Sequence, residues 1–215
     1  MSEGLDLRIV SVEKGYEIAG VQQLSIHTTR GTIPMILHAA AEPQRAAICV
    51  SGAIGGLDGP AFLYPRLGLE MPRRGVSIAR IDYRMPNEFG DCVLDTMAGI
   101  AVLGRLGHRQ IATIGHSFGG AVAINAGTIS PAVTTVIALS SQLAGAHVAS
   151  ELAPRPLLLI HGDADEILPP ASSEAIYERA QEPKTIRIIH GASHRLTEAD
   201  DEIFNLTSDW LLNRI

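Results

Sequence analysis

Six short apolar runs recur along this chain, each bounded by turn-forming or polar residues. Their residues are almost continuously apolar and do not alternate with polar ones, which predicts strands of a parallel sheet that is buried on both faces. The runs span residues 46–50, 76–81, 111–114, 135–139, 156–160 and 185–189. Such a sheet needs helices on both of its faces, so the pattern predicts a doubly wound α/β domain.

Helices are predicted between these strands. Apolar residues recur at helical spacing over residues 91–106, and Gly107 is placed to end that helix. A second helix is predicted from the Pro169-Pro170 pair to about residue 181, and a third over residues 198–212.

An antiparallel hairpin is predicted ahead of the parallel strands. Residues 21–28 and 32–39 flank Thr29-Arg30-Gly31, with glycine at the position of positive φ. No repeat, low-complexity tract or long polar linker interrupts the pattern, so we expect residues 1–215 to form a single domain.

Composition and charge narrow the possible partners. The chain has 215 residues, 46% of them hydrophobic, which is enough to bury a large core, and its formal net charge is -6. Without a run of Lys or Arg, we expect neither nucleic acid nor a membrane as partner, and a small-molecule substrate is favoured. The sequence shows no leader-like start and no apolar stretch of membrane-spanning length, so a cytoplasmic location is expected. The protein is expected to be a monomer or a homodimer.

Residues Gly115-His116-Ser117-Phe118-Gly119 match the motif G-x-S-x-G. The motif follows the predicted strand 111–114 and precedes an Ala- and Gly-rich helical stretch that begins at Gly120. A sharp strand-to-helix turn strains the backbone of the serine and needs small residues on both sides, and the N-terminus of the following helix favours a developing negative charge. The motif therefore predicts that Ser117 is a nucleophile.

A chance match is possible in a chain with 21 glycines, so the interpretation requires a base and a carboxylate later in the sequence. Two polar loops follow predicted strands at residues 161–169 and 190–194. Because functional groups gather at the carboxyl ends of parallel strands, both loops should open on the same edge as Ser117. On the residues alone, the candidates remain Asp163, Asp165, Glu166, His190 and His194.

These ordered motifs resemble those of the α/β-hydrolase superfamily, most nearly its small cap-less branches similar to dienelactone hydrolases and carboxylesterases. The resemblance extends from about Arg45 to the C-terminus. HGDAD followed by Pro169 is similar to the family's H-G-x-x-D-x-x-x-P acid loop, and GASH is similar to its G-x-x-H base loop. The resemblance implies the α/β-hydrolase fold, with Asp165 as the acid and His194 as the base. Residues 140–143, where some members carry the acid, contain no carboxylate, which also favours Asp165.

The loop at residues 51–56 resembles the family's H-G-x-G loop, with Ser51 in place of the histidine. This implies an oxyanion hole formed by the N–H groups of Phe118 and Ala53, with Ile54 as the alternative to Ala53. Its glycines do not have the G-x-G-x-x-G spacing of a dinucleotide site. Candidate substrate contacts are Ile54, Phe62 and Leu168. Phe62 could equally belong to the hydrophobic core, and Leu168 could simply face the solvent.

The remaining polar residues are interpreted as structural. His116 and His161 are expected to hydrogen-bond within their own turns, and Asp82 matches a structural aspartate that members of the superfamily often carry. The other histidines are expected at the surface or at strand ends, namely His27, His38, His108 and His147. No metal-binding motif such as H-E-x-x-H is present, and neither a metal nor another cofactor is expected.

The predicted function is hydrolysis of a carboxylic ester or thioester of a small substrate through an acyl-enzyme on Ser117. Only residues 143–155 separate two predicted strands, which leaves no room for a helical cap and predicts an open site for short or exposed esters. The alternatives are a peptidase, thioesterase or acyltransferase with the same triad, and a non-catalytic ligand-binding or scaffold protein on this fold.

Overall fold

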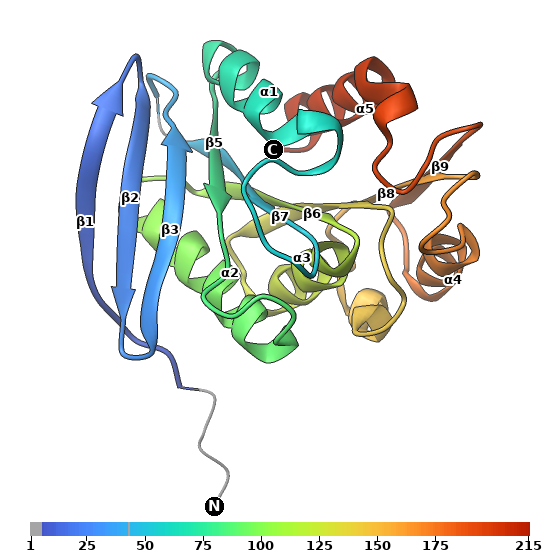
Figure 1. Cartoon of the computed structure of the whole chain (residues 1–215), viewed down its shortest axis with the longest axis horizontal. Helices are drawn as coiled ribbons and strands as arrows, with labels where there is room; N and C mark the ends of the chain where they lie inside the picture. Colours follow the sequence, from blue (N-terminus) through green and yellow to red (C-terminus); the bar gives the residue numbers. More distant parts are fainter. Residues whose placement is uncertain (1–5, 43) are drawn as a thin grey trace, which may run out of the picture.

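A computed structural model of the chain describes residues 6–42 and 44–215. Over these residues, nine strands form one sheet in the order β1-β2-β3-β5-β4-β6-β7-β8-β9 (Figure 1). The strands are β1 (Ile9–Ile18), β2 (Val21–Thr28), β3 (Gly31–His38), β4 (Arg45–Val50), β5 (Val76–Ile81), β6 (Gln110–His116), β7 (Val133–Leu139), β8 (Leu157–Gly162) and β9 (Lys184–Ile189).

All six predicted parallel strands are present. Strands β4 to β9 pair with one another in parallel, in the order β5-β4-β6-β7-β8-β9, and every residue of β5 and β8 is buried. This confirms that continuous apolar runs mark strands covered on both faces. Strand β9 is more exposed because it lies at the edge of the sheet.

The N-terminal part of the sheet is antiparallel, as predicted. Strands β2 and β3 form a hairpin whose Gly31 has φ of 118°, and β3 pairs antiparallel with β5. Strand β1, which pairs with β2, was not predicted. Its register shifts at two places and most of its residues are exposed, so its sequence lacks the regular alternation that marks a half-buried strand.

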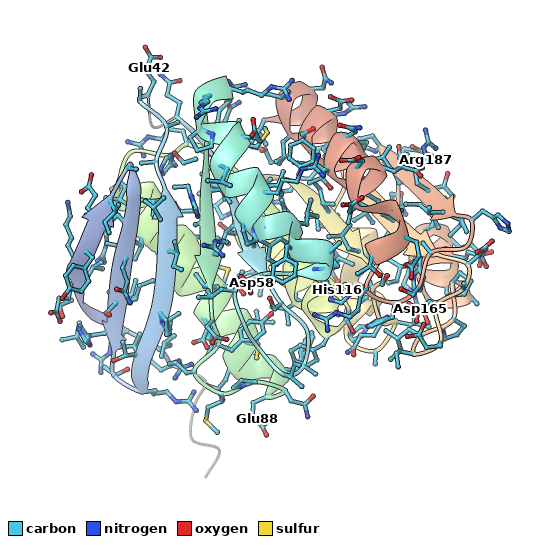
Figure 2. All side chains as sticks on the ribbon, turned by 45° about the horizontal axis from the view of Figure 1, so that its top comes forward. Glu42, Asp58, Glu88, His116, Asp165 and Arg187 are labelled. Atoms are coloured by element: carbon cyan, nitrogen blue, oxygen red, sulfur yellow. The ribbon has the colours of Figure 1, made fainter. Side chains whose placement is uncertain are left out.

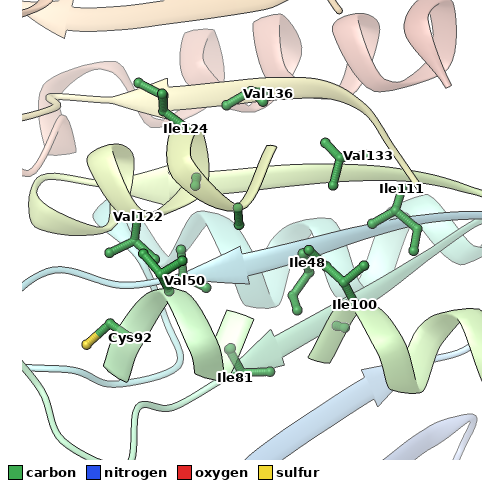
Figure 3. Close-up of a cluster of buried hydrophobic side chains, with 14 of the residues drawn as sticks. Ile48, Val50, Ile81, Cys92, Ile100, Ile111, Val122, Ile124, Val133 and Val136 are labelled. Atoms are coloured by element: carbon green, nitrogen blue, oxygen red, sulfur yellow. The ribbon is translucent and has the colours of Figure 1, made fainter. Parts of the chain in front are cut away.

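Helices cover both faces of the sheet (Figure 1). One core contains buried residues of the sheet and of α2 (Phe89–Arg105), α3 (Phe118–Ile129) and α4 (Ala171–Arg179), and Figure 3 shows part of it. The second core lies on the opposite face, where α1 (Leu63–Glu70) and α5 (Asp200–Arg214) pack.

The predicted helices are confirmed, with ends displaced by up to two residues. Helix α3 begins at Phe118, two residues before the predicted Gly120. Helix α1 was not predicted because it is short and contains Pro65 and Gly68, which weaken a helical pattern.

The segment between β7 and β8, described throughout, forms only a 3-10 helix at Ala146–Glu151, so the predicted absence of a cap domain is confirmed. Within the described residues, no helix combines the length and the apolar character needed to cross a bilayer.

The end of β4 packs closely against the start of α3, so a larger residue at Gly119 should lower the stability of the fold. A Cβ atom at Gly119 would lie 2.2 Å from the carbonyl oxygen of Ser51, whereas one at Gly104, in the last turn of α2, would meet no atom within 4 Å. We expect Gly119→Ala to lower the free energy of unfolding by about 1–3 kcal/mol or more, since β4 or α3 must shift.

The matched variant Gly104→Ala should leave stability unchanged or raise it by up to about 1 kcal/mol, because alanine is the better helix former. Urea unfolding of both variants measures the difference. Equal stability of the two variants would contradict the packing constraint at Gly119.

Candidate active site

Ser117 occupies the sharp turn between β6 and α3. Its φ of 58° and ψ of -120° lie in a region that L-residues rarely adopt. The turn is possible because Gly115 and Gly119, two positions to either side of the serine, have no side chains: a Cβ atom at Gly115 would lie 1.9 Å from the carbonyl oxygen of Gly119. The Ser117 N–H donates to the carbonyl of Leu139 at 2.8 Å, which ties the turn to the end of β7.

Asp165 and His194 come together from the loops that follow β8 and β9. Their Oδ2 and Nδ1 atoms are 2.7 Å apart, and the side chains are 0% and 11% exposed. Because the carboxylate accepts this bond, Nδ1 carries the proton, and a neutral His194 ring then has Nε2 free to accept another. His194 and Ser117 line the same cavity, of about 320 Å³.

The Asp165 carboxylate is buried but has several hydrogen-bond donors. Its Oδ1 atom accepts the N–H groups of Ile167 and Leu168, both at 2.8 Å. Burial raises the pKa of this carboxyl, but the N–H of Leu168, the His194 ring and the N–H of Ile167 together outweigh burial, and the pKa lies below its ordinary value. Asp165 is therefore ionised at neutral pH.

The other residues that the sequence left open pair elsewhere. Asp163 accepts hydrogen bonds from Nδ1 of His190 at 2.8 Å and from the N–H of Gly191 at 2.6 Å, and His190 is 98% exposed. Glu166 contacts the backbone N–H of His194 at 3.4 Å. Thus, of these candidates, the structure joins Asp165 to His194 in the cavity region and Asp163 to His190 at the surface.

The expectation that His116 bonds within its own turn was wrong, whereas His161 does bond within its own loop, to the Leu168 carbonyl at 3.1 Å, and also outside it. Nε2 of His116 donates to the backbone carbonyl of His194 at 2.9 Å, and the two rings lie 4.9 Å apart between centroids. Burial lowers the pKa of His116 to about 4, so this ring is neutral at neutral pH. His161 reaches across to α4, where its Nδ1 atom lies 2.7 Å from Oγ of Ser173.

The contacts of His116 with His194 and of His161 with Ser173 were not predicted, because each partner lies on a different element of the fold. The available signal was their place inside the G-x-S-x-G and H-G-x-x-D motifs. His38 is the last residue of β3, as expected of a strand end, and both His38 and His108 are buried.

The loop after β4 forms much of the cavity wall, and it includes Ala53 and Ile54. Two residues at the end of β5 form hydrogen bonds that hold this loop in place. Oδ1 of Asp82 accepts a hydrogen bond from the N–H of Gly56 at 2.7 Å, and Arg80 donates one to the carbonyl of Leu57 at 3.2 Å. Asp82 thus has the structural role that was expected of it.

The candidate substrate contacts differ in their positions. Ile54 lines the cavity and is 95% exposed. Phe62 and Leu168, both in the described part of the chain, are not among the lining residues, and Phe62 points to solvent. Phe118 is the first residue of α3, directly after Ser117, and its ring packs edge-on against Tyr83 and Phe89.

All of these groups lie at the carboxyl edge of the parallel strands. Figure 2 shows Asp58, His116 and Asp165 on this side of the molecule. Among residues 6–42 and 44–215, no group of three or more His, Cys, Asp and Glu side chains is arranged to hold a metal ion. The arrangement offers an acid–base pair, a serine at a strained turn and a loop rich in backbone N–H groups.

Several solved structures are similar to this chain over most of its length. Dienelactone hydrolase from Anabaena variabilis superposes with a TM-score of 0.78 at 18% identity, covering 91% of this chain and 99% of its own. Est1E from Butyrivibrio proteoclasticus gives 0.76 at 16% identity, covering 89% and 98%. Acetyl xylan esterase 1 from Thermoanaerobacterium gives 0.72 at 14% identity, covering 94% and 87%.

Sequence comparison matches a shorter region. The family model described as serine aminopeptidase S33 matches residues 144–201, which include Asp165 and His194 but not Ser117. The uncharacterized protein YfhR of Escherichia coli K12 is 39% identical over 56 residues, which is 26% of this chain and 20% of the length of YfhR. Taken with the sheet order and the strand–turn–helix at Ser117, these similarities show that the chain has the α/β-hydrolase fold.

Proposed function

We propose that this chain is a serine hydrolase that cleaves carboxylic esters or thioesters of small substrates through an acyl-enzyme on Ser117. The observation that carries the proposal is the pairing of Asp165 with His194 at 2.7 Å beside a cavity that Ser117 and His194 both line. A serine hydroxyl needs such a neighbouring base to become a nucleophile.

The reaction follows from the proton positions. Nε2 of His194 takes the hydroxyl proton as Oγ of Ser117 attacks the carbonyl carbon, and the same proton passes to the leaving alcohol or thiol as its bond to carbon breaks. Water then attacks the acyl-enzyme by the same route and releases the acid. Asp165, ionised at neutral pH, keeps the proton of His194 on Nδ1 and stabilises the imidazolium.

The negative charge on the substrate oxygen needs donors that are already in place. We assign this role to the N–H groups of Phe118, at the start of α3, and Ala53, in the loop that Asp82 holds at Gly56. The loop's anchoring supports this assignment, because a donor that had to be ordered during the reaction would contribute less.

Two observations favour an ester over an amide as the substrate. The segment between β7 and β8 leaves the cavity without a cap, so a small substrate reaches Ser117 directly. Proteins named as an esterase and as a dienelactone hydrolase share the fold over most of their length. A peptidase is the second candidate, favoured by the S33 aminopeptidase model that matches the region of the acid and base.

Replacing the nucleophile should abolish the activity. We expect Ser117→Ala to lower kcat for p-nitrophenyl acetate by at least about a thousandfold, since alanine has no hydroxyl with which to form the acyl-enzyme. Labelling with a fluorophosphonate probe should be lost in parallel. The control Ser25→Ala changes a serine on β2, away from the cavity, and should label and turn over like wild type.

Circular dichroism of both serine variants separates loss of activity from loss of fold. Unlabelled wild-type protein would favour the non-catalytic alternative, a ligand-binding or scaffold protein on this fold.

The two neighbouring aspartates should differ sharply in their effect. We expect Asp165→Asn to lower kcat by roughly ten-thousandfold, because the amide no longer holds the productive tautomer of His194. Asp163→Asn should have little effect, since Asp163 pairs with the exposed His190. Steady-state kinetics on both variants decides the assignment of the acid, and a reversed pattern would overturn it.

A further inference from the structure

His161 is a second histidine that contacts the acid of the Asp165–His194 pair. The imidazole is fully buried in β8 and is placed between the acid loop and helix α4. Its Nε2 atom is 3.0 Å from Oδ2 of Asp165 and 3.1 Å from the carbonyl oxygen of Leu168, while Nδ1 is 2.7 Å from Oγ of Ser173. A continuous buried chain of polar contacts therefore runs from His194 through Asp165 and His161 to Ser173.

The surroundings of the ring fix its protons. Nε2 faces a carboxylate oxygen and a carbonyl oxygen, which are both acceptors, so Nε2 must carry a proton. Nδ1 faces the Ser173 hydroxyl, which can donate to a bare ring nitrogen. Ser173 thereby favours the neutral tautomer that directs its single N–H toward the acid loop.

The His161 ring also lies beside the acid, with Nε2 3.0 Å from Oδ2 of Asp165. Oδ1 of Asp165 is occupied by two backbone N–H groups, whereas Oδ2 has the rings of His194 and His161. A buried carboxylate depends on its donors, because water does not reach it. The same His161 N–H also contacts the Leu168 carbonyl, while the Leu168 N–H donates to Asp165, so the loop is held from both ends.

We propose that His161 and Ser173 are positioning residues that extend the Ser117–His194–Asp165 triad by two members: Ser173 orients His161, and His161 orients Asp165 and shares its Oδ2 atom with His194. This proposal rests on the proposed function. The competing interpretation is that His161 only fastens the loop through Leu168 and has no influence on the acid–base pair.

The test compares His161→Leu, which removes the donor, with His161→Gln, whose side-chain amide can replace the Nε2–H group. The matched control is His108→Leu, because His108 is also a buried histidine but precedes β6 at the end opposite Ser117. Ser173→Ala removes only the contact at Nδ1.

We expect His161→Leu to lower kcat for p-nitrophenyl acetate by about ten- to a hundredfold with little change in KM, since the substrate does not touch His161. His161→Gln should restore most of the loss, Ser173→Ala should show a smaller loss, and His108→Leu should resemble wild type. If His161→Leu loses no more kcat than His108→Leu, or if KM carries the effect, the proposal is wrong.

The pH–rate profile distinguishes positioning from loose packing. Without the His161 donor, Oδ2 of Asp165 interacts more strongly with the His194 imidazolium, so the acidic limb of kcat/KM should move to higher pH. The other titratable or charged groups near the pair are Glu166, His116 and Arg195, and they are the same in every variant. If the acidic limb of kcat/KM stays at the wild-type pH and only the plateau value of kcat/KM falls, His161 serves loop packing alone.

A measurement that needs no substrate tests this proposal independently of the proposed function. In ¹⁵N-histidine spectra, wild-type His161 should show the Nε2–H tautomer, and the signal, assigned by its absence from His161→Leu, should change in Ser173→Ala. An Nδ1–H tautomer would overturn the network even in an active enzyme. Wild-type protein that shows the expected tautomer but neither hydrolyses esters nor reacts with a fluorophosphonate would instead refute the proposed function.

Discussion

A buried negative charge at Asp165 constrains the whole carboxyl edge of the sheet. Taking a carboxylate out of water is costly unless hydrogen-bond donors replace the lost hydration. Here the hydrogen-bond donors come from the carboxylate's own loop and from His194 in the loop after β9, while Nε2 of His161 on β8 lies 3.0 Å from Oδ2. Since each donor must reach one carboxylate, the loops after β8 and β9 have little freedom to move apart.

The loop that carries His194 is held by polar contacts on several sides. Oε2 of Glu198 accepts from the N–H of Ser193 at 3.0 Å and from its hydroxyl at 2.8 Å, Asp163 accepts from Gly191, and His116 donates to the carbonyl of His194. The backbone groups of this loop are thus satisfied by side chains. Such a supporting shell fixes the orientation of the imidazole, which the proposed chemistry requires within a fraction of an ångström.

Much of the fold was predictable because burial on both faces leaves a strong sequence signal. Every residue of β5 and β8 is buried, and the corresponding runs are mostly apolar. Strand β1 gives no comparable signal, since it is an exposed edge strand with an irregular register, and the short helix α1 contains Pro65 and Gly68. In each case tertiary pairing stabilises an element that its own sequence specifies weakly.

By itself, the sequence determined the parallel sheet, the turn at Ser117 and the order of the polar loops, because hydrophobic periodicity and glycine spacing act locally along the chain. Only the tertiary structure decided which carboxylate lies beside which histidine. It joined Asp165 to His194, placed Asp163 beside His190 at the surface, brought His116 to the backbone of His194, and gave His161 a second partner on α4. The physical reason is that hydrogen bonds between side chains depend on distances between loops that are far apart in sequence, and parallel strands bring those loops to one edge only when the sheet is complete.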